Sequence, residues 1–162
     1  NAEKSLLLYR DSFGEALIPL LSTNLGRAVY SQEFPYNLEL NDESYGMIMI
    51  ELVERNIPNL LTGAPLMQAS EKQLPTDAVS VSCTANAQKR SGFTQLYGSI
   101  AAYPAAERIY IEVACTDGAV RVYEAFPVND SGDADPAWES ASGYLLTLPE
   151  GIEGKVSGAY IG

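Results

Sequence analysis

The sequence predicts an α+β protein in which an α/β segment with a partial parallel sheet, residues 1–73, is followed by a β-rich antiparallel module, residues 74–162. Before Leu74-Pro75-Thr76-Asp77, apolar runs of strand length alternate with helix-like periodicity, which is typical of β-α-β units with parallel pairing. After this point the pattern is alternating and rich in turn residues, which favours an antiparallel sheet or sandwich packed on the first segment.

The elements of the first segment follow from local patterns. We expect a strand, a helix, two further strands and a short helix, in that order, over residues 5–9, 14–25, 27–31, 45–52 and 56–62. The runs Leu6-Leu7-Leu8 and Met47-Ile48-Met49-Ile50 are continuously apolar, as expected of strands covered on both faces. Leucines at three- and four-residue spacings predict a buried stripe on the first helix, with Pro19 in its first turns (Leu17, Leu20, Leu21 and Leu25).

The second segment is predicted to contain strands over residues 78–85, 92–101, 108–116, 119–127, 143–148 and 155–161. Asp117-Gly118 between two of these runs indicates a hairpin, because glycine accepts the positive φ that such turns require. Asp130, Asp133 and Asp135 could offer oxygen ligands to Ca²⁺, but the closing glutamate of an EF-hand loop is absent, so we expect a solvated acidic loop.

Composition excludes several classes of partner and ligand. The 162 residues include 21 acidic and 10 basic side chains, and the net charge of −11 disfavours nucleic acid and anionic membrane surfaces. No apolar run approaches the roughly 18 residues of a membrane span. Cys83 and Cys115 could pair across strands or stay as buried thiols, and two cysteines without histidine are too few soft ligands for a metal. We expect no cofactor and no metal.

Asp11-Ser12-Phe13 is the main candidate for chemistry. A buried strand that turns at a serine into a helix holds the hydroxyl at the carboxyl end of a sheet, where backbone N–H groups can bind an oxyanion. Ser12 is therefore the candidate nucleophile. The chain contains no histidine, and a serine hydroxyl needs a general base near neutral pH, so the base must lie outside these 162 residues.

Arg55 and Asn56 follow a predicted parallel strand and could approach Ser12 from the next strand end, where they would bind an oxyanion or a carboxylate. Alternatively, Arg55 pairs with Glu51 or Glu54 and Asn56 caps the short helix. Asp11 is expected to fix the turn by accepting backbone N–H groups rather than to act as a base.

Three segments carry a family resemblance. Residues 7–17 (LLYRDSFGEAL), 27–30 (RAVY) and 47–57 (MIMIELVERNI) resemble the carboxyl-terminal part of DHHW-type SGNH-hydrolase-like proteins, relatives of the alginate O-acetyltransferase SGNH domains. The resemblance covers about residues 5 to 62. In that group an Asp-x-His or Asp-His-His-Trp element lies upstream of the serine, and neither element occurs here. The resemblance implies a partial SGNH-like sheet with Ser12 as nucleophile and an Asp-His pair in a missing upstream segment that contacts this chain.

Two functions remain open. The chain is either the carboxyl-terminal portion of an exported serine esterase or O-acetyltransferase acting on cell-surface polysaccharide, inactive by itself, or a non-catalytic carbohydrate-binding or scaffold module. Both predict a polysaccharide or acylated carbohydrate as partner and an extracellular or cell-surface location. Aromatic side chains of the second segment could form a sugar-stacking face or pack in the core (Tyr97, Tyr103, Tyr110, Tyr123, Trp138, Tyr144 and Tyr160).

Overall fold

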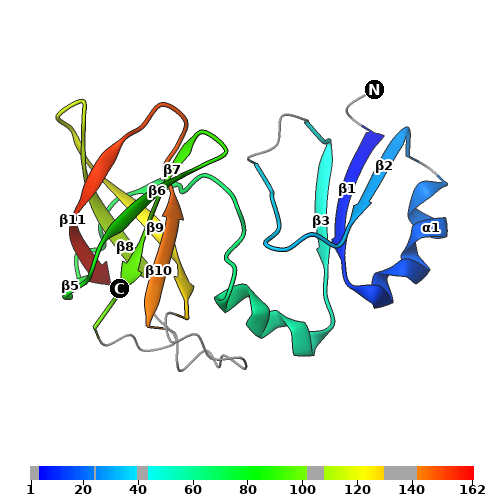
Figure 1. Cartoon of the computed structure of the whole chain (residues 1–162), viewed down its shortest axis with the longest axis horizontal. Coiled ribbons are helices and arrows are strands. Elements are labelled where there is room, and N and C mark those ends of the chain that lie inside the picture. Colours follow the sequence, from blue (N-terminus) through cyan, green and yellow to red (C-terminus); the bar gives the residue numbers. More distant parts are fainter. Residues whose placement is uncertain (1–3, 24, 40–43, 102–107, 130–141) are drawn as a thin grey trace.

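The computed structural model describes residues 4–23, 25–39, 44–101, 108–129 and 142–162. It is β-rich, with a small parallel sheet, a large antiparallel sheet and short helices. Figure 1 shows two lobes side by side, with the parallel sheet in blue to cyan and the antiparallel sheet in green to red.

The first lobe is a β-α-β arrangement, as predicted. Its three-stranded sheet has the order β2-β1-β3, and β1 pairs in parallel with both neighbours. A 3-10 helix runs into a short α-helix between the first two strands, and α1 packs against β2. The elements are β1 (Ser5–Arg10), η2 (Ser12–Leu17), α1 (Ile18–Ser22), β2 (Arg27–Ser31) and β3 (Met47–Glu51).

The central strand β1 forms the core of this lobe, and its four apolar side chains from Leu6 to Tyr9 are at most 4% exposed. Leu7 and Tyr9 share one face and cluster with Tyr36, whose ring centroid lies 5.3 Å from that of Tyr9. The loop that carries Tyr36 therefore covers this face of the sheet.

The predicted leucine stripe is wrong. Leu20 is 72% exposed, and the other three leucines are only half-buried. The helix begins with 3-10 turns of about three residues each, so spacings suited to an α-helix do not fall on one face, and it ends at Ser22 rather than at Leu25.

The expectation that Met47 to Ile50 is covered on both faces is also wrong. Met47, Ile48 and Ile50 are 55%, 37% and 38% exposed. β3 is an edge strand whose only strand neighbour in the described part of the chain is β1, so its outer side stays open.

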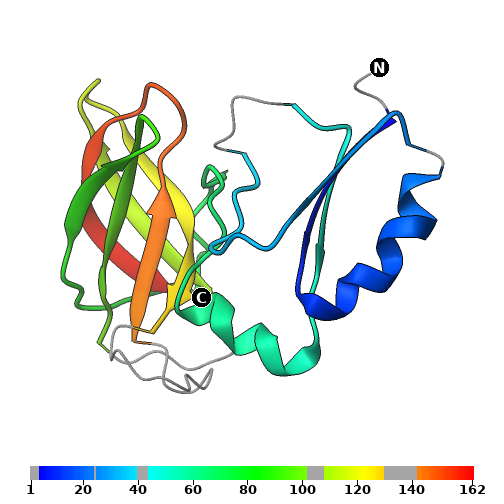
Figure 2. The same cartoon turned by 45° about the vertical axis from the view of Figure 1, so that its right-hand side comes forward.

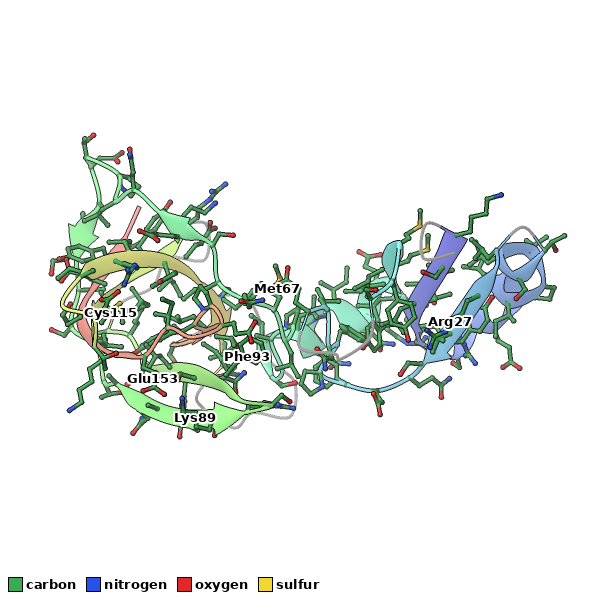
Figure 3. The ribbon with its side chains drawn as sticks, turned by 90° about the horizontal axis from the view of Figure 1, so that it is seen from above. Arg27, Met67, Lys89, Phe93, Cys115 and Glu153 are labelled. Carbon is green, nitrogen blue, oxygen red and sulfur yellow. The ribbon has the colours of Figure 1, made fainter. Side chains whose placement is uncertain are left out.

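The helix η3 (Glu54–Leu61) and an extended segment connect the two lobes (Figure 2). The Leu38 N–H donates to the Leu66 carbonyl over 2.9 Å, and the Asn129 N–H donates to the Leu61 carbonyl over 2.7 Å. Met67, labelled in Figure 3, lies where the chain passes from one lobe to the other. The lobes are thus joined by ordered backbone contacts.

The second lobe is one eight-stranded antiparallel sheet rather than a sandwich. Its strand order is β5-β11-β8-β9-β10-β7-β6, and β4 pairs with β9. The strands are β4 (Glu71–Lys72), β5 (Val79–Ser80), β6 (Asn86–Arg90), β7 (Phe93–Ser99), β8 (Ile109–Cys115), β9 (Val120–Val128), β10 (Gly143–Thr147) and β11 (Gly154–Ile161).

This sheet closes on itself, because β5 and β6 follow one another in the chain and stand at opposite ends of the strand order. The Val81 N–H donates to Ala159 of β11 over 2.9 Å, and the Thr84 N–H donates to Ser99 of β7 over 3.0 Å. We call the junction where the segment from β5 to β6 lies between β11 and β7 the seam. Lys89 of β6 and Glu153, which directly precedes β11, form an ion pair across this seam and are labelled in Figure 3. We call this lobe the barrel.

Apolar side chains from β7, β8, β9, β10 and β11 form the core of the barrel, among them Leu96, Ile111, Tyr123, Leu146 and Ile161. The hairpin predicted at Asp117-Gly118 is present: Gly118 has φ +85°, and its N–H donates to the Cys115 carbonyl over 3.0 Å. Cys115 is buried, Cys83 is half-buried, and both are free thiols.

Candidate active site

Ser12 lies in a tight strand-to-helix turn, as the sequence predicts: β1 ends at Arg10, Asp11 is the N-cap, and Ser12 is the first residue of η2. Its side chain is exposed, and among the described residues it forms no hydrogen bond. The hydroxyl is therefore presented to solvent beyond the carboxyl end of the central strand of the parallel sheet.

Asp11 anchors this turn. Its Oδ1 accepts the Phe13 N–H over 2.9 Å, while its Oδ2 accepts the Val53 N–H over 2.8 Å and the Asn56 side-chain amide over 3.1 Å. The Val53 hydrogen bond is the main cause that holds the pKa of the Asp11 carboxyl below its ordinary value, and the donors of Phe13, Asn56 and Gly14 add to it. A carboxylate so engaged is a weak proton acceptor, which agrees with its predicted role in fixing the turn.

The structure brings Arg55 and Asn56 to the same end of the sheet. Asn56 does not cap η3, whose N-cap is Val53, but reaches back to Asp11. The Arg55 guanidinium carbon lies 5.2 Å from the centroid of the Phe13 ring, a cation–π contact. Within the described residues Arg55 has no ion pair with Glu51 or Glu54. The Arg55 guanidinium is thus held against the residue that follows Ser12 in the sequence.

The expected oxyanion donors are only partly available. The Phe13 N–H is given to Asp11, and the Gly14 N–H also acts on that carboxylate. An oxyanion at Ser12 would have to displace these bonds or use other donors, such as the Arg55 side chain.

Sequence reasoning missed a buried polar pair under the turn. Arg10 and Glu51 are register partners on β1 and β3, and their Nε and Oε2 atoms are buried and have no hydrogen-bond partner within the described part of the chain. Gly14 packs directly on them: a Cβ built there would lie 2.8 Å from Arg10 Cβ and would collide with Glu51 Oε2. Gly14, two residues after Ser12, was the feature of the sequence that could have indicated this close packing.

Other candidate ligands do not assemble. Among the described residues, no three His, Cys, Asp or Glu side chains come close enough together to hold a metal ion. Asp130, Asp133 and Asp135 lie outside the described residues. None of the helices in the described part of the chain is both long enough and apolar enough to cross a bilayer.

Of the two alternatives for the aromatic side chains of the second segment, a sugar-stacking face or core packing, the structure favours core packing. Tyr110, Tyr123 and Tyr144 are 6%, 1% and 0% exposed and belong to the barrel core. Tyr97 and Tyr160 are half-buried, while Tyr103 and Trp138 lie outside the described residues. Aromatic side chains in this lobe are mainly packing residues.

Comparisons with protein-family models, with curated proteins and with solved structures return no match for this chain.

Proposed function

We propose that this chain carries the nucleophile half of a serine-dependent esterase or O-acetyltransferase site that acts on acylated cell-surface polysaccharide. In this reaction the Ser12 oxygen attacks the ester carbonyl carbon, and the serine proton passes to a general base on a segment outside these 162 residues. The ester C–O bond then breaks, the base returns the proton to the leaving alcohol, and the acyl group held on Ser12 passes to water in an esterase or to an acceptor hydroxyl in a transferase. The family resemblance of residues 5–62 suggests that an Asp-His pair supplies this base, that the chain is part of an SGNH-like domain and that the whole protein is exported.

The observation that carries the proposal is the combination of an exposed Ser12 and an anchored Asp11. The hydrogen bonds from Val53 and Asn56 tie the serine turn to the chain that leaves the neighbouring strand, although these residues are more than forty positions away in sequence. A nucleophile needs such fixed placement, because small misplacements cost large factors in rate.

The open edge of β3 supports contact with a further segment. Its exposed Met47, Ile48 and Ile50 present apolar surface, and no other described strand pairs with this edge. The Asp11 N–H donates to the Glu51 carbonyl at the end of β3 over 3.3 Å, so the carboxyl end of this strand lies beside the serine turn. A strand added in parallel to β3 would deliver its carboxyl end to the same side of the sheet as Ser12.

Ester hydrolysis tests the proposal. The 162-residue chain should hydrolyse p-nitrophenyl acetate no faster than its Ser12→Ala variant, because positioned general-base catalysis, worth about 10² to 10⁴ in rate, is missing. A longer form of the protein that carries an Asp-x-His element should turn over this ester and acetylated oligosaccharides. Ser12→Ala should abolish this turnover, and Ser70→Ala, at an exposed serine of the connecting segment, should not.

A non-catalytic carbohydrate-binding or scaffold module is the second candidate, and the absence of histidine favours it for this polypeptide alone. Failure of the longer form on both ester classes would favour this alternative over the serine reaction. Robust Ser12-dependent hydrolysis by the 162-residue chain would contradict the half-site account.

A further inference from the structure

A groove of about 390 Å³ lies between the two lobes. Both lobes and the segment that connects them line it, with Phe34, Gly63, Arg90, Tyr97, Asn129 and Leu145 among the contributors. Ligand sites of this size often form between domains, where apolar walls and a few polar groups converge.

Phe34 gives the groove an exposed aromatic ring in a fixed position. The ring is packed edge-on against Tyr36, with centroids 5.4 Å apart and an interplanar angle of 86°, yet Phe34 is 43% exposed. Gly63 allows this placement, since a Cβ there would lie 2.7 Å from the Phe34 Cζ atom. A held and exposed ring can stack against the apolar face of a sugar at little cost in conformational entropy.

Arg90 gives the groove a positive charge that no carboxylate of the described residues neutralises. Among the described residues the Arg90 side chain has no ion pair, hydrogen bond or ring contact, and none of the described lining residues is acidic. The other arginines each contact a carboxylate, a carbonyl or an aromatic ring (Arg10, Arg27, Arg55, Arg108 and Arg121). Because no described residue pairs with it, the Arg90 guanidinium marks a place where an anion can bind, although the chain as a whole carries a net charge of −11.

We infer that the groove binds an acidic carbohydrate, with a sugar ring stacked on Phe34 and a carboxylate bound by Arg90. A guanidinium binds a carboxylate through two parallel N–H···O bonds, and the hydroxyl of Tyr97, which also lines the groove, suits a sugar hydroxyl. None of these residues belongs to the serine site, so this binding requires neither Ser12 nor an added base.

The test measures, by NMR and by calorimetry, how tetragalacturonate and the neutral tetrasaccharide maltotetraose bind to the 162-residue chain. Tetragalacturonate should bind with shifts of groove residues and more tightly than maltotetraose. Arg90→Gln should weaken binding of the acidic probe about tenfold or more, and Arg90→Glu should abolish it. Arg90 is exposed, so both variants should keep the fold, which thermal unfolding will verify.

The matched control is Arg108→Gln, at an arginine whose side chain is 66% exposed and which lies outside the groove lining. It should bind the acidic probe like the unchanged protein, and so should Ser12→Ala, which separates this inference from the proposed reaction. Equal affinity for the two probes, an Arg90→Gln variant that binds unchanged, or no binding of tetragalacturonate up to about 10 mM would each overturn the inference.

Discussion

Replacing Gly14 by alanine should displace the serine turn. The added methyl group would lie 2.8 Å from Arg10 Cβ and 3.2 Å from Arg10 Cδ, and it would overlap Glu51 Oε2. The Glu51 side chain can rotate, but Arg10 Cβ is fixed to the central strand, so η2 must move outward. Overpacking of this kind costs about 1 to 3 kcal/mol. For a chain of this length that corresponds to a melting temperature lower by about 3 to 10 °C.

Thermal and urea unfolding of Gly14→Ala measure this effect, and Gly26→Ala is the matched control. At Gly26 the new Cβ would lie 3.8 Å from the Lys4 carbonyl oxygen, an ordinary contact, so stability should change by no more than about 0.5 kcal/mol. Adding Glu51→Ala to Gly14→Ala should recover only part of the loss, because the Arg10 contact remains. Equal stability of Gly14→Ala and the unchanged protein would refute this account of the turn.

Three further predictions concern packing and charge. Leu8→Ala, at a fully buried position, should cost about 2 to 5 kcal/mol in unfolding free energy, while Leu20→Ala should cost less than about 0.5 kcal/mol. Tyr144→Phe removes a 2.9 Å hydrogen bond to the Thr84 carbonyl and should cost about 1 kcal/mol at pH 8 in urea titrations. Burial raises the pKa of Tyr144 from 10.0 to about 12, so the stability that its neutral form contributes is fully present below about pH 10 and is lost as pH rises through about 12. By pH 11 the unchanged protein should lose about 1.4 kcal/mol of unfolding free energy relative to Tyr144→Phe. A stability difference between the two proteins that does not change with pH would contradict this. Asp11→Asn should be less stable at neutral pH, and because the Asp11 pKa is lowered from 3.8, the difference should shrink as the carboxyl protonates in acid; a constant difference down to pH 2 would exclude a role for the charge.

The serine turn was predictable because its determinants are local. An apolar strand, an Asx residue and a glycine follow one another within ten residues, and each restricts the backbone without help from distant contacts. The bond from Asn56 to Asp11 was not predictable, since it joins residues 45 positions apart and depends on how β3 pairs with β1.

Burial on the two apolar strands was predictable only in part. Leu6 to Leu8 and Met47 to Ile50 have the same pattern, yet the first run is central and the second lies at an edge. Hydropathy indicates that a strand has apolar faces and does not indicate what covers them. The strand β6 was not predicted, because Asn86–Arg90 shows no alternation of apolar residues. This segment is extended because it pairs with β7.

The closure of the barrel has a consequence for how the protein folds. Val79 pairs with Ile161 and Ser80 with Tyr160, so the seam joins residues about eighty positions apart along the chain. Such pairings raise the contact order, and domains dominated by them fold in milliseconds to seconds rather than microseconds. During synthesis, β5 must wait for the last strand to leave the ribosome before it finds its partner. Until then the edges of β5 and β8 that β11 will join remain open, and this interval is when the chain is most exposed to aggregation.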